Sequence, residues 1–279
     1  MRMSNAALAQ DPTGNDNQRE NRSLQKVVVG AVLISLIWKA VYFIFLDYFN
    51  RTIPLQDPFF PEVFRNQTVV CVVYLLGVAT ALLMLLSKSG SILSLGSLLL
   101  VITMFTLNIH QSSFNDVTFL CCGWSALWCW WFSTQLSEPN ESLHPRAAWL
   151  AHAILSLILI GGSVGKMTPE YWSGQVLYEI YFVDRDFWFY NIIRTCCSAD
   201  GLRDVAMHHS RLVIVTEFAC GFLWLLPIRT ASWLALIVLL GIALTNSVLL
   251  FSVVTSLLGL AIVGLHQPKQ LPPISTETV

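Results

Sequence analysis

The chain has 279 residues, of which 55% are hydrophobic and only 12% are charged. A soluble globular domain carries about 25% charged residues, so this composition excludes an ordinary water-soluble protein. The formal net charge of -1, without a run of Lys or Arg, excludes nucleic acid as a partner and leaves the lipid bilayer as the expected surroundings.

In chain order, a polar N-terminal segment is followed by a series of apolar stretches. Residues 1–24 lack the apolar core of a signal peptide and predict a disordered cytoplasmic tail. A span needs about 20 apolar residues to cross a bilayer core of roughly 30 Å. The predicted spans are 27–46, 68–86, 92–108, 117–134, 147–165, 212–226, 231–251 and 252–265.

These stretches predict an all-α, polytopic membrane helix bundle of about eight transmembrane helices, over residues 25–266. A count of seven spans is the alternative, if the stretch after Ser252 does not form its own span. Arg19, Arg22 and Lys26 precede the first span, which favours a cytoplasmic N-terminus. An even count then places the tail 267–279 in the cytoplasm and the polar interfacial segment 166–210 outside.

The sequence lacks the metal-binding and catalytic motifs that are typical of soluble enzymes. The seven cysteines show no C-x-x-C pair and no Cys/His spacing suited to zinc, so no metal site is predicted. There is also no nucleophile elbow, phosphate-binding loop or dinucleotide fingerprint. Function must therefore lie in the spans and their connections.

Charged residues inside apolar stretches are the strongest functional clues, since each costs about 2.5 to 3.5 kcal/mol at the bilayer centre unless it has a partner. Lys39 lies inside the first span and predicts a buried charge paired with a carboxylate. Glu217 predicts a pair with Lys39 or Lys166, with a role in proton handling as the alternative. Arg229 is a second candidate buried charge, or a contact to lipid headgroups.

Lys166 is the leading candidate for catalysis. It follows the glycine-rich stretch IGGSVG and precedes Pro169, a pattern that permits a helix to break and a new one to begin. A partly desolvated lysine loses its proton more easily and becomes a base. An ordinary interfacial lysine is the alternative.

The other candidate site residues surround this position in the predicted topology. His110 ends the third span on the same side as Lys166, so both are expected to line one cavity, with His110 orienting the ligand. Asn108, Trp124 and Trp172 complete the predicted ligand-binding residues, together with Glu217. For Trp124 a place in an aromatic belt at the headgroups is the alternative.

Three segments resemble a known membrane domain. The segment SVGKMTPEYWSGQVLYEIYF is similar to the "aGvxKLxxxWxxGxxl" segment of the horizontally transferred transmembrane (HTTM) domain. That domain forms the membrane part of vitamin K-dependent gamma-carboxylases. EFACGFLWLLPIRTASW and NIHQSSFNDVTFLCCGW resemble two further segments, and together the three matches extend over most of residues 25–265.

The resemblance implies a bundle of about eight helices with an outward-facing cavity. It implies that Lys166 is the base that initiates oxygenation of reduced vitamin K, that His110 matches a loop histidine, and that Glu217 and Arg229 match the acidic and basic residues. Two departures weaken the expectation of full carboxylase activity. No histidine precedes the Asn-Ser of the seventh span, near Ala243, and no β-rich lumenal domain is predicted.

The expected function is therefore an HTTM-domain membrane protein that binds a quinone-like or lipidic ligand, with a reduced, vitamin K-like quinone as cofactor. If it is an enzyme, it is a gamma-carboxylase-like lyase or monooxygenase. One alternative is a non-catalytic immunity, secretion or assembly factor that docks a membrane or secreted protein partner. Another is a DoxX-like quinone-linked subunit.

Overall fold

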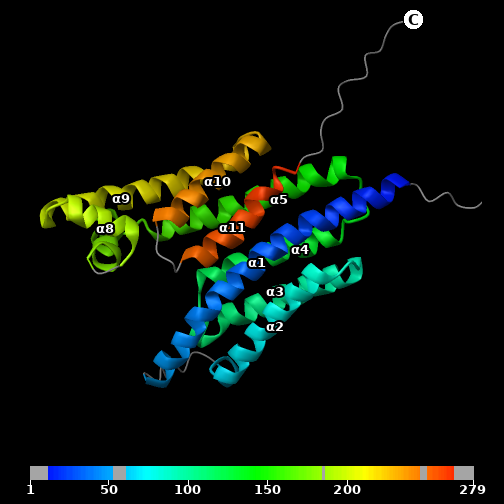
Figure 1. Cartoon of the computed structure of the whole chain (residues 1–279), viewed down its shortest axis with the longest axis horizontal. Helices are drawn as coiled ribbons and strands as arrows, with labels where there is room; N and C mark the ends of the chain where they lie inside the picture. Colours follow the sequence, from blue (N-terminus) through cyan, green and yellow to red (C-terminus); the bar gives the residue numbers. More distant parts are fainter. Residues whose placement is uncertain (1–11, 53–60, 184–185, 246–249, 267–279) are drawn as a thin grey trace, which may run out of the picture.

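The protein is all-helical in the computed structural model, which describes residues 12–52, 61–183, 186–245 and 250–266 (Figure 1). The long helices are α1 (Pro12–Thr52), α2 (Gln67–Leu86), α3 (Gly90–Ile109), α4 (Val117–Ser133), α5 (Asn140–Gly165), α9 (Ala199–Cys220), α10 (Ile228–Thr245) and α11 (Phe251–Val263). The short helical segments are η1 (Glu62–Phe64), η2 (Gln111–Ser113), α6 (Pro169–Trp172), α7 (Gln175–Leu177), η3 (Tyr178–Phe182), α8 (Trp188–Cys196) and η4 (Leu223–Leu225).

Within the described residues, five helical stretches are long and apolar enough to cross a membrane: Asn17–Ala40 of α1, and the helices α2, α3, α5 and α10. α4 and α11 are apolar but shorter. The all-α prediction is confirmed for the described residues, and the five apolar helices suit a membrane, where a helix satisfies its backbone hydrogen bonds internally. The count of eight spans stays a prediction.

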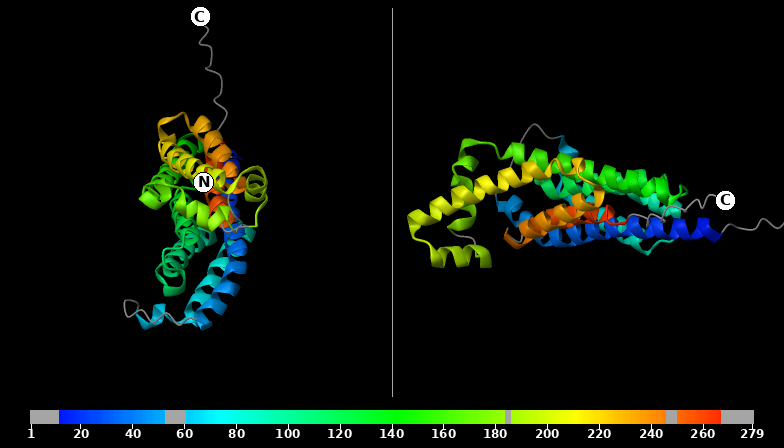
Figure 2. Two further views of the ribbon diagram at one scale, coloured as in Figure 1. Left: turned by 90° about the vertical axis from the view of Figure 1, so that its left-hand side faces the viewer. Right: turned by 90° about the horizontal axis from the view of Figure 1, so that it is seen from above.

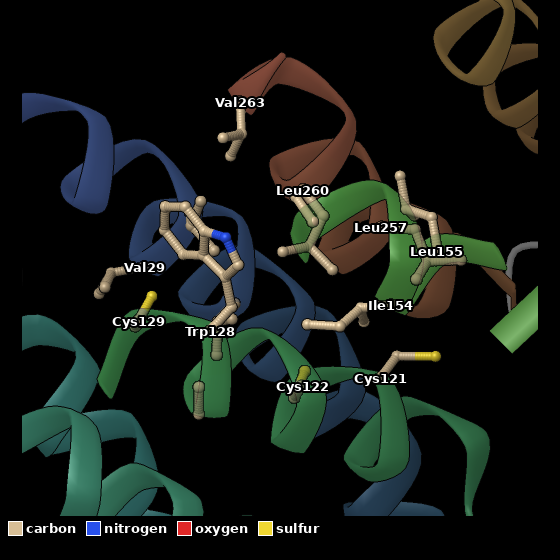
Figure 3. Packing of buried hydrophobic residues seen from close by; sticks show 14 of the residues in the cluster. Val29, Cys121, Cys122, Trp128, Cys129, Ile154, Leu155, Leu257, Leu260 and Val263 are labelled. Atoms are coloured by element: carbon tan, nitrogen blue, oxygen red, sulfur yellow. The ribbon is translucent and has the colours of Figure 1, made fainter. Parts of the chain in front are cut away.

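The long helices run along one another and form an elongated bundle (Figures 1 and 2). α1 packs against α2, α4 and α11, while α5 lies between α11 and α9. The backbones of α1 and α11 approach closely at Gly259, where an added Cβ would lie 2.6 Å from the Cβ of Ala31. The shared core includes Trp128 of α4, whose indole N–H donates to the Ala147 carbonyl of α5 at 2.9 Å (Figure 3).

The start of α1 corrects the prediction of a disordered tail over residues 1–24, since residues 12–24 are helical. Asn21 and Gln25 are fully buried, one turn apart on the same helix face. The Asn21 side chain accepts from His144 Nε2 at 2.8 Å, and Gln25 donates to the Cys129 carbonyl at 3.0 Å. Polar composition indicated disorder, but these side chains form tertiary hydrogen bonds. Residues 1–11 and the predicted tail 267–279 lie outside the described residues.

Replacing Asn21 by Ala tests whether this polar contact anchors α1. We expect a loss of about 1 to 3 kcal/mol of stability, because the buried His144 ring loses its acceptor. Thermal unfolding can be followed with a thiol-reactive dye, since Cys121, Cys122 and Cys129 are buried. Ser23→Ala, at an exposed position of the same helix, is the control. Equal melting temperatures for both variants would contradict the anchoring role.

Candidate functional site

The polar segment after α5 folds into short helices at one end of the bundle (Figures 1 and 2). α5 ends at Gly165, and a new turn starts at Pro169, as the sequence predicts, with the Thr168 hydroxyl accepting from the Tyr171 N–H. Gly174 has φ +79°, and an added Cβ there would lie 2.4 Å from the Met207 backbone of α9. The segment is therefore held directly against α9.

Lys166 forms an ion pair with Glu217 of α9. The Lys166 Nζ lies 2.6 Å from Glu217 Oε2, and the two side chains are 28% and 13% exposed. Gly162, one turn before Lys166, lies next to the pair, and an added Cβ would lie 3.4 Å from Glu217 Oε2, at an ordinary contact distance. Of the two partners that the sequence left open for Glu217, the structure selects Lys166.

This ion pair lies beside a cavity of about 260 Å³ between α5, α9, α10 and α11. The polar lining residues are Lys166, Tyr171, Tyr181, His209, Ser210 and Glu217. The other lining residues are Val117, Ile158, Leu159, Gly162, Leu177, Val213, Leu239, Ile242, Leu250, Val253, Val254 and Leu257. The cavity thus combines an ion pair and a few hydrogen-bonding side chains with a mostly apolar wall.

Burial changes the proton affinity of two polar groups in the cavity. Desolvation lowers the pKa of His209, which favours the neutral imidazole. Desolvation also raises the pKa of Tyr171, with smaller contributions from Tyr181 and Glu217. Both side chains are thus uncharged near pH 7, and the Lys166–Glu217 pair is the only ion pair among the described lining residues.

Lys39 forms a separate ion pair away from this cavity. Its Nζ lies 2.5 Å from Asp116 Oδ2, and the side chains are 11% and 18% exposed. Asp116 also caps α4, where its carboxylate accepts from the Thr118 N–H at 2.8 Å. The prediction that Lys39 is a buried charge with a carboxylate partner is confirmed. The described lining of the cavity includes neither residue.

The prediction that His110 lines the cavity beside Lys166 is wrong, because the described lining of that cavity does not include His110. Its Nε2 donates to the Asn66 carbonyl at 3.1 Å, and its Nδ1 accepts from the Ser112 N–H at 3.2 Å. Because both ring nitrogens are used within the loops, His110 joins α2 to α3 and cannot also orient a ligand.

The remaining predicted site residues also lie away from the cavity. Asn108, in the last turn of α3, accepts from the Asn115 N–H through its backbone carbonyl. Trp124 is half-buried and packs against the main core. Trp172 is exposed, with the Arg211 guanidinium 5.4 Å from its ring centroid. Arg229 is exposed at the start of α10, so its assignment as a buried charge is wrong.

Sequence reasoning identified Glu217 of α9 but missed two residues on the same face of this helix. The missed residues, His209 and Val213, line the cavity with Glu217, and the three follow one another at intervals of four residues. Side chains at this spacing share one helix face. The signal was present in the sequence, but the assignment of His209 to a loop segment hid it.

Comparison of the chain with protein-family models, with curated proteins and with solved structures finds no match. The residues of the site themselves indicate its chemistry. An ammonium and a carboxylate in contact can exchange one proton, which gives a neutral amine and a neutral acid. Lys166 and Glu217 can thus accept or supply a proton inside an apolar cavity.

A double-mutant cycle tests the coupling between Lys166 and Glu217. Glu217→Leu alone should cost about 2 kcal/mol of stability, because it leaves a largely buried ammonium without its carboxylate. Adding Lys166→Met should recover much of that loss, since no unpaired charge remains. Thermal unfolding of the four proteins in detergent measures the coupling. Simple additivity of the two single effects would contradict a structural pair.

The pH dependence of stability tests the buried state of His110. Desolvation lowers the pKa of His110 below 6.5, and the Asn66 carbonyl opposes this only in part. Below pH 6.5 the unfolded chain therefore binds a proton that the folded chain does not, and stability falls as the pH falls. His110→Gln should make the melting temperature less dependent on pH between about 6.5 and 5. An unchanged slope would indicate that His110 is solvated.

Proposed function

We propose that the chain is a multi-pass membrane protein whose cavity beside Lys166 and Glu217 binds a quinone-like lipid. The observation that carries the proposal is the cavity itself, with an ion pair in one region and apolar side chains over most of its wall. Ligand sites of this kind are mostly apolar, with a few polar groups that fix orientation. An amphipathic ligand with a polar ring and an apolar tail matches this division.

The charges of the cavity favour an uncharged ligand head over a phosphate. Lys166 is the only basic residue in the described lining apart from His209, and Glu217 already neutralises it. Phosphate groups are usually bound by several donors or by unpaired Arg and Lys. A ring with carbonyl or hydroxyl oxygens needs only hydrogen bonds, which Lys166, Tyr171 and His209 are able to supply.

The resemblance to the HTTM domain supports a chemical role for Lys166, as a proton acceptor in carboxylase- or oxygenase-like chemistry. A reduced quinone supplies reducing equivalents and acidic hydroxyl groups when bound. Transfer of the Nζ proton to the Glu217 carboxylate leaves Lys166 as a neutral amine, ready to accept a proton. The mostly apolar wall lowers the polarity around this exchange, and His209, rather than His110, is the imidazole in the cavity lining.

The proposal includes an eight-span topology with both termini in the cytoplasm and the segment 166–210 outside. The three basic residues around the start of the first span support this orientation, because cytoplasmic flanks carry an excess of Lys and Arg. The start of α1 and the segment that follows α5 also lie at opposite ends of the bundle (Figure 1). The cavity then opens toward the outer side of the membrane.

Quinone binding by the purified protein tests the proposal. A prenylated naphthoquinone, titrated into detergent-solubilised protein and counted by native mass spectrometry, should bind saturably at one molecule per chain. Lys166→Met should weaken binding about tenfold or more, since a hydrogen bond to a charged group contributes about 1.5 to 3 kcal/mol. Arg229→Gln, at an exposed position outside the cavity, should bind as the wild type does.

Two outcomes would overturn the proposal. Equal affinities of the wild type and Lys166→Met would place the ligand elsewhere. No saturable binding, together with a protein that copurifies at one copy per chain, would instead favour a non-catalytic partner protein.

A further inference from the structure

A second hollow adjoins the cavity on the side of α9 and α10. This groove has a volume of about 330 Å³, and its own lining includes Phe189, Leu212, Thr216, Val238, Gly241 and Thr245. It shares four residues with the cavity: His209, Val213, Glu217 and Ile242. The two hollows therefore lie next to each other along one face of α9, and the shared side chains, Glu217 among them, form the boundary between them.

The groove exists because α9 and α10 are held apart. α9 packs on α5 and α10 packs on α11, while α9 and α10 make few backbone contacts with each other. Gly241 widens the space further, because an added Cβ at this position would meet no atom within 4 Å. A chain of methylene or isoprene units fits a passage of this kind, because most of its exposed wall is apolar.

The surface around the groove has the character of a lipid-facing surface. Leu212 of α9 and Ile237 and Leu244 of α10 are 63%, 63% and 60% exposed. Of the five candidate spans, α10 is the least buried inside the protein, at 22% against 33% to 50% for the others. Exposed apolar side chains at this density mark a contact with lipid or another apolar partner.

We propose that the groove between α9 and α10 is a lateral access route, through which a ligand dissolved in the bilayer reaches the Lys166–Glu217 pair. The apolar tail of the bound ligand then occupies the groove while its ring lies in the cavity. This inference rests on the proposed function and adds the path and the class of ligand, a long-chain lipid. A ligand that enters in this way never leaves an apolar environment, so its tail is not exposed to water.

Photolabelling of the full-length protein in phosphatidylcholine vesicles tests the route. The probe is a prenylated naphthoquinone with a diazirine on its tail, and peptide mass spectrometry locates the labels. In the wild type we expect labels in the groove, near Val238, and in the cavity, near Val253 and Leu257. Gly241→Trp should slow labelling of the cavity about tenfold, which corresponds to about 1.4 kcal/mol of added barrier.

Matched variants separate a blocked route from a damaged fold. Gly161→Trp, on α5 outside both hollows, is the control, because an added Cβ there also meets no atom within 4 Å. It should label at the wild-type rate, and Gly241→Leu should give an intermediate rate. A short-chain, water-soluble naphthoquinone diazirine should label the cavity equally in all four proteins, because it also enters from the aqueous side.

The outcomes that contradict the route differ from those that contradict the proposed function. Cavity labelling by the long-chain probe at the wild-type rate in Gly241→Trp would overturn the route and leave the cavity as a binding site. Equal slowing of both probes would also overturn it, since the substitution would then have closed the cavity itself. Absence of cavity labels in the wild type with either probe would overturn the proposed function as well.

Discussion

The ion pair between Lys166 and Glu217 is the constraint on which one end of the bundle, with the short helices after α5, depends. It joins the end of α5 to the last turn of α9, next to Gly162 of α5. Burying a single charge here would cost free energy, whereas two opposite charges in contact offset part of each other's desolvation cost. Because the polar segment after Lys166 packs on the same helix, the pair sets both the position of α9 and the polar region of the cavity.

The described residues include two ion pairs between a lysine and a carboxylate in apolar surroundings, and the two pairs differ in what they border. The Lys39 side chain is less exposed than that of Lys166, and its partner Asp116 also caps α4. The Asp116 carboxylate oxygens therefore accept hydrogen bonds that hold the fold together. The Lys166–Glu217 pair instead borders a cavity, where its remaining donors and acceptors face open space. A lysine in an apolar stretch therefore indicates a buried pair, but the surroundings of the pair decide whether a ligand can reach it.

Hydrophobic patterning predicted the helices well, because apolar stretches of this length have few alternatives in a bilayer. It did not predict that residues 12–24 are helical, since the buried contacts of Asn21 and Gln25 are with residues more than 70 positions away in the sequence. The candidate site was also predicted only in part, because it too depends on contacts between residues that are far apart in the sequence. The cost of a buried charge predicted that Glu217 pairs with Lys39 or Lys166, but it did not decide between them. That His110 is held by loop hydrogen bonds, and that His209 lies on the cavity face of α9, depends on tertiary contacts that the sequence pattern does not show.

α9 is the wall that the cavity and the groove have in common. His209, Val213 and Glu217 line both hollows, so the helix separates them only by the thickness of these side chains. On its other contacts α9 is held by α5 and by the short helices after Lys166, and only weakly by α10. The position of α9 therefore determines both the width of the groove and the distance between Glu217 and Lys166.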